Sequence, residues 1–421
     1  MTLSRRRLLQ LTGAATVASL PASRAAAEEG ATPAPLVALT DRTKDVAPIS
    51  LDEHRARLAR AQKLLADSGL QALVVGPGTG LNYFTGARWG LSERFFGMVL
   101  TAGSEPSWVT PAFEQRRAEE QIQIGKDVRA WQEDESPFAL VATVLKDRGV
   151  ATGKVGLEET LPFAFADGIA KALPGATLAS GTPVTGGCRM IKDAHELAIM
   201  RKANEITVRA HRAVFQSLRE GMSHDEAAGL TVEAHKRQGV EGGSLILFGP
   251  DAAFPHGTTK PRTLAAGDIV LIDGGCTLHG YASDITRTGV FGKAPTARQR
   301  EVWELVRKAQ DAAFRTVRPG VECQAVDAAA RQVLTDGGFG PGYKFLTHRL
   351  GHGIGMDGHE HTYLVRGNTT KLQPGMCFSD EPGIYIPGEL GIRHEDIFFV
   401  TAEGAENMTR WTGPPEDPAV V

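Results

Sequence analysis

One arrangement of helix signals occurs twice in the second half of the chain. A long amphipathic pattern over residues 194–218 ends at the turn 219–222, Arg-Glu-Gly-Met, and a shorter helix follows. A second long pattern ends at residues 318–321, Arg-Pro-Gly-Val, which match 219–222 at an offset of 99. Capping boxes pair Ser223 with Glu226 and Thr296 with Gln299. We therefore predict an internal duplication, with strands from two related halves around one central cleft.

Residues 49–185 are expected to form a separate first domain. Apolar residues recur at helical spacing over 51–65, and the apolar run 70–75 reads as a buried strand. Helix and strand patterns then alternate, which is typical of an α/β fold. The Gly- and Pro-containing stretch 181–187 marks the predicted boundary, so the second domain is expected to span 186–421.

Residues 1–27 resemble a twin-arginine export signal. Arginines at 5–7 precede a weakly apolar stretch that ends at Leu20, and the alanines at 25–27 offer a cleavage site. This stretch is shorter than the ~20 residues that span a bilayer, so we expect no stable membrane insertion after processing. The mature protein is predicted to be periplasmic or secreted. Residues 28–48, rich in Ala and Pro, are expected to be a flexible linker.

Charge and cysteine content exclude several classes of protein. Lys and Arg number 46 against 49 acidic residues, without long runs of one sign, so a nucleic-acid partner is not expected. Four scattered cysteines are too few for a disulfide framework and are expected to be small buried residues. They are Cys188, Cys276, Cys323 and Cys377.

Two aspartates follow strand patterns in the second domain. The apolar run 269–272 reads as a buried strand that leads directly into Asp273, and Asp284 follows after ten intervening residues. A hairpin would set these two carboxylates side by side. In an apolar setting one of them would take up a proton unless positive charge neutralises the pair.

Three more candidate ligands follow: His352 between two glycines, Glu381 before Pro-Gly, and Glu395. Together with the two aspartates they make a set of four carboxylates and one imidazole. Two divalent cations would balance the four carboxylates. Such an oxygen-rich set favours manganese, with cobalt, iron or zinc as alternatives.

These five residues resemble the metal-ligand pattern of the pita-bread metallopeptidases in type, order and flanking glycines: Asp273, Asp284, His352, Glu381 and Glu395. The likeness extends to residues 82–86, and to 189–192 with Glu196. With these matches, the sequence resembles the Xaa-Pro branch of the family, which contains prolidase and aminopeptidase P. The resemblance implies an α+β protein: an α/β N-terminal domain followed by a creatinase-like pita-bread catalytic domain with a pseudo-twofold duplication. It also implies hydrolysis of small proline-containing peptides by a homodimer or higher homo-oligomer.

The resemblance further implies catalytic roles. His256, His348 and His359 match histidines that line the cleft in this family. We expect Glu381 to act as general base as well as ligand, and His359 to stabilise the oxyanion. Glu381 or His256 would pass a proton to the proline nitrogen. Arg393 could orient a ligand carboxylate, meet the substrate, or form a structural ion pair, and these roles stay open.

Other readings remain open at this stage. One is a lyase or esterase on the same scaffold, although Gly275 stands where one lyase branch has an extra acid. Another is a metal-free binding protein. The sequence does not separate dipeptidase from aminopeptidase action, and residues 361–362, His-Thr, depart from the usual family pattern. By analogy alone, Trp89 or Arg94 of a neighbouring copy would cap the cleft.

Overall fold

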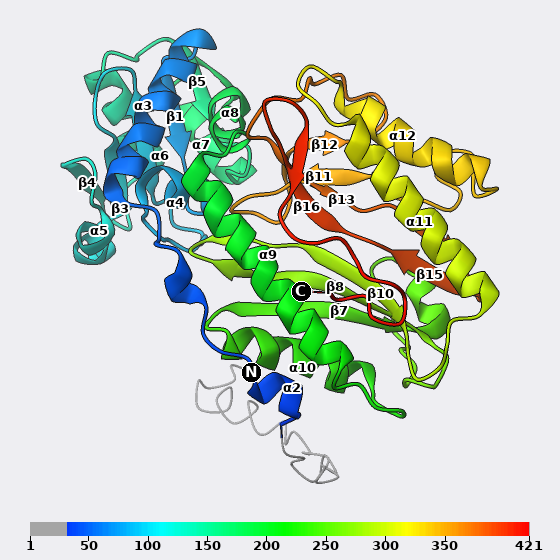
Figure 1. Ribbon diagram of the computed structural model, residues 1–421. Helices are drawn as coiled ribbons and strands as arrows, with labels where there is room; N and C mark the ends of the chain where they lie inside the picture. The colour runs from blue at the N-terminus through cyan, green and yellow to red at the C-terminus, as the bar shows by residue number, and fades with distance from the viewer. Residues whose placement is uncertain (1–31, 421) are drawn as a thin grey trace, which may run out of the picture.

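The computed structural model describes residues 32–420, so the predicted export signal lies outside the described residues. Figure 1 shows two parts, with the first domain at the upper left and the second domain below and to the right. The helix α9, Ala194–Phe215, runs from the junction with the first domain along the second.

The first domain is built on one mixed sheet in the order β4-β3-β2-β1-β5-β6. Strand β1 is buried along its whole length, because apolar side chains pack on both faces of the sheet. It pairs parallel with β5 and antiparallel with β2. The strands are β1 Ala72–Val75, β2 Gly97–Thr101, β3 Ser107–Pro111, β4 Asp127–Trp131, β5 Gly153–Leu157 and β6 Ala176–Ser180.

Helices cover this sheet. The first of them begins at Ser50, whose side chain forms a capping box with Glu53. The helical segments are α3 Leu51–Asp67, α4 Thr79–Thr85, η2 Ala112–Glu114, α5 Gln115–Gln121, α6 Pro137–Asp147, α7 Phe163–Ala172 and α8 Thr182–Arg189. The α/β character predicted for this region is therefore confirmed.

The second domain contains two larger sheets and a hairpin. One sheet has the order β10-β8-β7, with β9 on β8, and the other has the order β12-β11-β13-β16-β17. The first set of strands is β7 Glu241–Phe248, β8 Ile269–Leu278, β9 Tyr281–Ala282 and β10 Ile285–Val290. The second set is β11 Gly351–Gly353, β12 Glu360–Leu364, β13 Cys377–Asp380, β16 Asp396–Val400 and β17 Ala405–Asn407. The hairpin joins β14 Gly383–Ile386 to β15 Leu390–Arg393.

Each sheet follows a pair of helices, as the predicted duplication requires. Helices α9 and α10, His224–Arg237, pack against β7 and β8. Helices α11, Ala297–Thr316, and α12, Cys323–Asp336, pack against strands of the other half. The predicted capping boxes start α10 and α11. An isolated antiparallel bridge between Thr286 and Glu395 joins the two halves. The remaining short segments are α2 Ala34–Val37, η1 Thr43–Asp45 and η3 Gly249–Ala253.

Two predictions about segment boundaries are wrong. The ordered chain was expected to begin near Ile49, but Leu36 is fully buried among side chains of α9 and α10, so residues from 34 onward are docked rather than a free linker. The glycines at 186 and 187 do not break the chain between domains, because they lie inside α8. A Cβ at Gly187 would come 3.2 Å from Leu64, so this glycine allows α8 to pack closely on α3.

Trp89 does not reach outward to another copy. Its ring is buried in its own domain, stacked on Phe96 with 4.1 Å between centroids and covered by Arg117. The guanidinium of Arg94 pairs with Glu93 and Glu133. The expected capping role is therefore wrong for Trp89, and the oligomeric state stays a prediction.

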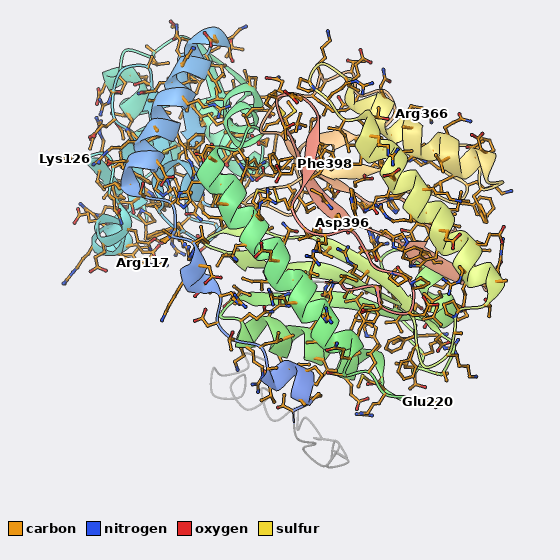
Figure 2. All side chains as sticks on the ribbon, in the orientation of Figure 1. Arg117, Lys126, Glu220, Arg366, Asp396 and Phe398 are labelled. Atoms are coloured by element: carbon orange, nitrogen blue, oxygen red, sulfur yellow. The ribbon has the colours of Figure 1, made fainter. Side chains whose placement is uncertain are left out.

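Some charged side chains lie at the surface, and others are buried in the second domain beside apolar residues. Figure 2 shows Arg117, Lys126 and Glu220 at the periphery, whereas Asp396 and Phe398 lie within the second domain and are buried. The prediction for the cysteines is confirmed, because all four are buried and unpaired. Among residues 32–420, no helix combines the length and apolarity needed to cross a membrane.

Candidate metal centre

The first two candidate ligands come from the sheet of the first half. Asp273 lies within β8, opposite Thr286 on β10, and Asp284 immediately precedes β10. The antiparallel pairing predicted for these segments is confirmed. The Thr286 hydroxyl oxygen lies 2.6 Å from Asp273 Oδ1 and 2.8 Å from Glu395 Oε2. Thr286 therefore joins a carboxylate of the first half to one of the second.

The other three candidates come from the second half. His352 is the central residue of β11, Glu381 directly follows β13, and Glu395 lies between β15 and β16. Ser379 supports two of them: its hydroxyl donates to Glu381 Oε1 at 3.1 Å and accepts from the His352 amide at 3.0 Å. The two halves thus deliver their ligands to one point between them.

His352 presents one free nitrogen to the carboxylates. Its Nδ1 lies 3.0 Å from the Gly353 carbonyl oxygen and must carry the proton, which leaves the Nε2 lone pair available. Nε2 lies 3.3 Å from Glu381 Oε1 and 3.9 Å from Asp284 Oδ2. Burial lowers the pKa of His352 to about 4, so the imidazole is neutral near pH 7. A neutral imidazole is the form that binds metal ions.

The carboxylates repel one another in the absence of a bound cation. Burial raises the pKa of Asp284, and the charges of Asp273 and Glu381 raise it further. Burial followed by the Asp284 and Glu381 charges raises the pKa of Glu395 in the same way. Burial raises the pKa of Glu381 to about 8, although Arg393 opposes this. Deprotonation of these groups together therefore requires additional positive charge.

The donor set fits divalent cations. Ligand atoms lie within 4.8 Å of one another in three overlapping groups: Asp273, Asp284 and Glu395; His352, Glu381 and Glu395; and Asp284, His352 and His359. The groups share members, as two neighbouring ions with bridging carboxylates would require. Oxygen-rich ligation with a single histidine suits hard or borderline divalent metals. All five predicted ligands are brought together, and His359 lies beside them.

Arg393 contacts a candidate ligand directly. Its Nη2 lies 2.6 Å from Asp273 Oδ2, and its Nε donates to the Thr286 hydroxyl at 3.2 Å. Burial alone would raise the pKa of Asp273, but Arg393 and the Thr286 hydroxyl hold it below the ordinary value. Of the roles left open for Arg393, the geometry supports orientation of a ligand carboxylate.

His348 belongs to the same chain of hydrogen bonds. The Tyr385 hydroxyl accepts from Arg393 Nη1 at 2.8 Å and lies 2.7 Å from His348 Nε2. His348 Nδ1 lies 2.7 Å from the Arg349 carbonyl oxygen, so both ring nitrogens are engaged. Burial lowers the pKa of His348 to about 4. A direct contact with substrate would require release of one of these bonds, and the catalytic role of His348 stays a prediction.

His359 and His256 are the exposed histidines of the cleft. The His359 ring stacks on His352 with 3.8 Å between centroids. Within residues 32–420 its ring nitrogens make no hydrogen bond, and one of them lies within 4.8 Å of ligand atoms of Asp284 and His352. Burial, then Arg349 and His256, lower the pKa of His359. His256 lies in the turn after η3. The catalytic roles of both histidines stay predictions.

Sequence reasoning missed Thr286, Ser379, Tyr385 and Arg349. Thr286 and Ser379 each lie two residues from a candidate ligand, Asp284 and Glu381, and this spacing would have placed each pair on one face of a strand. Tyr385 meets Arg393 through the register of the β14–β15 hairpin. The Arg349 guanidinium lies 4.2 Å from the centre of the Tyr363 ring. No local sequence pattern predicts the contact of Tyr385 with Arg393 or that of Arg349 with Tyr363.

Comparisons with known proteins show which family the chain is similar to. The model of metallopeptidase family M24 matches residues 198–402, and that of the creatinase/prolidase N-terminal domain matches residues 57–191. The probable dipeptidase PepE of Mycobacterium tuberculosis is 38% identical over 360 residues, which span 84% of this chain and 94% of that protein. The Xaa-Pro dipeptidase of Lactobacillus delbrueckii subsp. lactis is 33% identical over 358 residues, 84% of this chain and 96% of that protein.

Solved structures show the same likeness. The crystal structure of dipeptidase PepE from Mycobacterium ulcerans matches with a TM-score of 0.81 and 35% identity. The match covers 87% of this chain and 98% of that one. The likeness therefore extends over both domains rather than over the metal centre alone.

Proposed function

The chain belongs to metallopeptidase family M24, and from this premise we propose that it is an Xaa-Pro dipeptidase that works with two divalent metal ions. Its creatinase-type N-terminal domain and pita-bread catalytic domain are those predicted from the sequence. The observation that carries the proposal is the convergence of four carboxylates and one neutral, buried imidazole from both halves of the second domain. Glu395 is buried, and the other three carboxylates are half-buried. The names of the relatives, dipeptidase and Xaa-Pro dipeptidase, support the choice of substrate.

We propose that Asp273, Asp284, His352, Glu381 and Glu395 hold the ions. Manganese is the first candidate, with cobalt, zinc or iron as alternatives, because the ligands are mainly carboxylate oxygens. When bound, such ions lower the pKa of a water molecule and polarise a carbonyl oxygen. The remaining chemistry falls to side chains of this chain.

Glu381 is proposed as the proton carrier. Its carboxylate lies at the centre of the site, 3.3 Å from His352 Nε2. Burial raises the pKa of Glu381, and the charge of Arg393 opposes this rise. A carboxyl group whose pKa lies closer to neutral pH than usual can both accept and release a proton there. Glu381 would take a proton from the attacking water molecule as the oxygen of that water adds to the scissile carbonyl carbon. It would return the proton, directly or through His256, to the proline nitrogen as the C–N bond breaks.

His359 is proposed to donate a hydrogen bond to the scissile carbonyl oxygen as that oxygen gains negative charge. The ring is neutral near pH 7, exposed to the cleft, and held by stacking on His352. Proline at the scissile bond supplies no amide hydrogen. A site that works through the carbonyl oxygen and the nitrogen lone pair is therefore compatible with proline.

The substrate assignment is tested with three peptides in metal-defined buffer: Ala-Pro, Ala-Ala, and a longer peptide that begins Ala-Pro. We expect Ala-Pro to be cleaved with a kcat/KM at least about tenfold above that of the other two, a ratio that corresponds to about 1.4 kcal/mol. Preference for the longer peptide would show an aminopeptidase instead. Failure to cleave any of them under metal-replete conditions would favour a lyase or esterase on the same scaffold.

We further propose that the protein is exported through its twin-arginine signal. The support is the sequence of residues 1–27, with Arg5 and Arg6 before the apolar stretch. Replacement of both arginines by lysine should leave an active, uncleaved precursor in the cytoplasm. Fractionation followed by N-terminal sequencing measures this. Normal export and trimming of the double variant would instead indicate a general secretory signal.

A further inference from the structure

His359 is the last residue of a loop whose backbone amides bind the side chain of the next residue, Glu360. Residues 354–359 connect β11 to β12, and β12 begins at Glu360. Glu360 Oε1 accepts hydrogen bonds from the backbone amides of Met356, at 2.9 Å, and Asp357, at 3.2 Å. The loop is therefore folded around the carboxylate of the residue that directly follows His359.

Two buried cations hold that carboxylate from outside the loop. Arg189 donates to Glu360 Oε1 through Nε at 3.2 Å and through Nη2 at 2.5 Å. Lys192 Nζ donates to Glu360 Oε2 at 2.9 Å. Burial alone would raise the pKa of Glu360, but the charges of Lys192 and Arg189 hold it at about 2. The carboxylate is thus ionised at every working pH and fully paired.

The cations belong to the junction with the first domain. Arg189 is the last residue of α8, and Lys192 lies in the short segment between α8 and α9. The same Arg189 pairs with Asp357 Oδ2 at 2.5 Å, and Thr79, the first residue of α4, donates to Asp357 Oδ1 at 2.6 Å. Asp357 of the loop and Glu360, which directly follows the loop, are therefore both bound by residues of the first domain or its junction.

Such contacts fix the loop strongly. Arg189, Lys192 and Glu360 are each less than a tenth exposed. A buried charge that loses its partner is left uncompensated, so the loop cannot move away without a large energetic penalty. Among residues 32–420 the His359 ring stacks on His352 and makes no hydrogen bond, so its placement depends on the backbone that Glu360 anchors.

We propose that Arg189 and Lys192 are positioning residues for His359, acting through Glu360, so that the first domain supports the catalytic site from the junction. The inference deepens the proposed function and depends on it for the kinetic part of its test. A second, independent measurement follows the loop itself.

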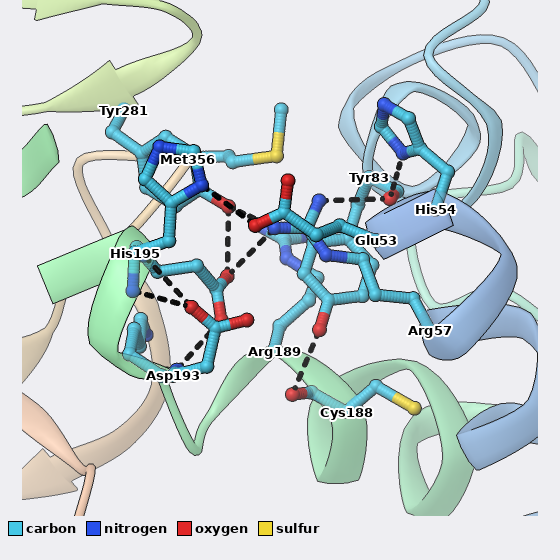
Figure 3. Close-up of polar contacts among 12 residues, drawn as sticks. Glu53, His54, Arg57, Tyr83, Cys188, Arg189, Asp193, His195, Tyr281 and Met356 are labelled. Atoms are coloured by element: carbon cyan, nitrogen blue, oxygen red, sulfur yellow. Dashed lines mark hydrogen bonds and ion pairs between the residues drawn. The ribbon is translucent and has the colours of Figure 1, made fainter. Parts of the chain in front are cut away.

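The junction offers a matched control in Arg57 of α3. Figure 3 shows its network: Arg57 donates to the Tyr83 carbonyl oxygen at 3.0 Å and to the Tyr281 hydroxyl at 2.6 Å. It also pairs with Glu196 at 3.3 Å. Arg57 is buried like Arg189 and also joins the two domains. Within the described part of the chain, its hydrogen bonds and its ion pair go to Tyr83, Tyr281 and Glu196 and none goes to residues 354–360.

The kinetic test compares Arg189→Lys with Arg57→Lys, since both changes keep the charge and remove the guanidinium fork. We expect Arg189→Lys to lower kcat on Ala-Pro on the order of tenfold or more with metal content unchanged, because a small displacement of a catalytic group is costly. Arg57→Lys should lower the Tm and leave kcat near the parent value. Lys192→Met serves as a second variant should Arg189→Lys fold poorly.

The decisive comparison uses the His359→Ala background. Arg189→Lys should cause no further loss of kcat there, because its effect passes through the missing ring. The proposal would be overturned if the double variant lost kcat by the product of the losses in His359→Ala and Arg189→Lys. It would also be overturned if Arg57→Lys lowered kcat as much as Arg189→Lys does.

Hydrogen exchange reads the loop without reference to activity. The amides of Met356 and Asp357 should exchange faster in Arg189→Lys than in Arg57→Lys, because only the first change releases their acceptor. Equal exchange in the two variants would overturn the positioning of the loop. If the parent protein cleaves no Xaa-Pro substrate, the proposed function fails, while the exchange measurement still decides this inference.

Discussion

Replacement of His352 by alanine is expected to reduce the metal content from two ions per chain to one or fewer and to lower kcat by more than ~10²-fold. Supporting residues around a metal typically cost 10–100-fold when removed, and a direct ligand should cost more. His352 is the one imidazole among the five candidate ligands, and its Nε2 faces both Glu381 and Asp284. Elemental analysis of metal-replete protein, together with turnover of Ala-Pro, measures both effects.

His224→Ala is the control for this experiment. His224 begins α10, and its ring lies 3.2 Å from Asp225, away from the candidate metal centre. It should retain both ions and parental activity. An His352→Ala variant that still holds two ions per chain after loading with manganese would remove His352 from the ligand set. A parent protein that binds no metal would refute the whole centre.

His359→Ala is expected to lower turnover by ~10²–10³ while both metal ions remain bound. A hydrogen bond to the developing oxyanion is lost, and losses of this size are typical of such donors. Among residues 32–420 the His359 nitrogens make no hydrogen bond and the side chain is exposed, whereas both ring nitrogens of His348 are engaged. Steady-state kinetics and elemental analysis on the same preparation separate the two consequences.

His359→Gln refines this test, because glutamine retains an N–H donor. We expect it to recover part of the activity that His359→Ala loses. Turnover of His359→Ala close to that of the parent would assign His359 to the surface of the cleft without a catalytic part. Loss of metal together with loss of turnover would instead make His359 a ligand, as its proximity to Asp284 and His352 permits.

Features set by local sequence were predictable. Ser223 with Glu226 and Thr296 with Gln299 each form the expected capping box, because three residues suffice to define that contact. The run 269–272 forms the expected strand and delivers Asp273 to its place. The five candidate ligands were found together because each carries its own flanking residues, and their order along the chain matches a known pattern.

Contacts between distant segments were not predictable. Glu360 and its partner Arg189 are 171 residues apart, and no spacing rule joins them. The segment around Leu36 has the composition of a linker, and its burial depends on the groove that α9 and α10 provide. A glycine can end a helix or can let a neighbouring helix pack closely, and the sequence does not distinguish these two roles. For Gly187, the approach of Leu64 in the folded protein shows that the second role applies.

The state of the four cysteines bears on whether folding depends on the redox conditions around the protein. Each thiol is buried and unpaired, so no covalent cross-link ties one part of the fold to another. Burial raises the pKa of Cys188 and Cys377 to about 12, which leaves their thiols protonated and slow to react with oxidants. The native state should thus be the same whether the chain folds in a reducing cytoplasm or meets an oxidising periplasm. We therefore expect the Tm of the protein to be the same with and without a thiol reductant.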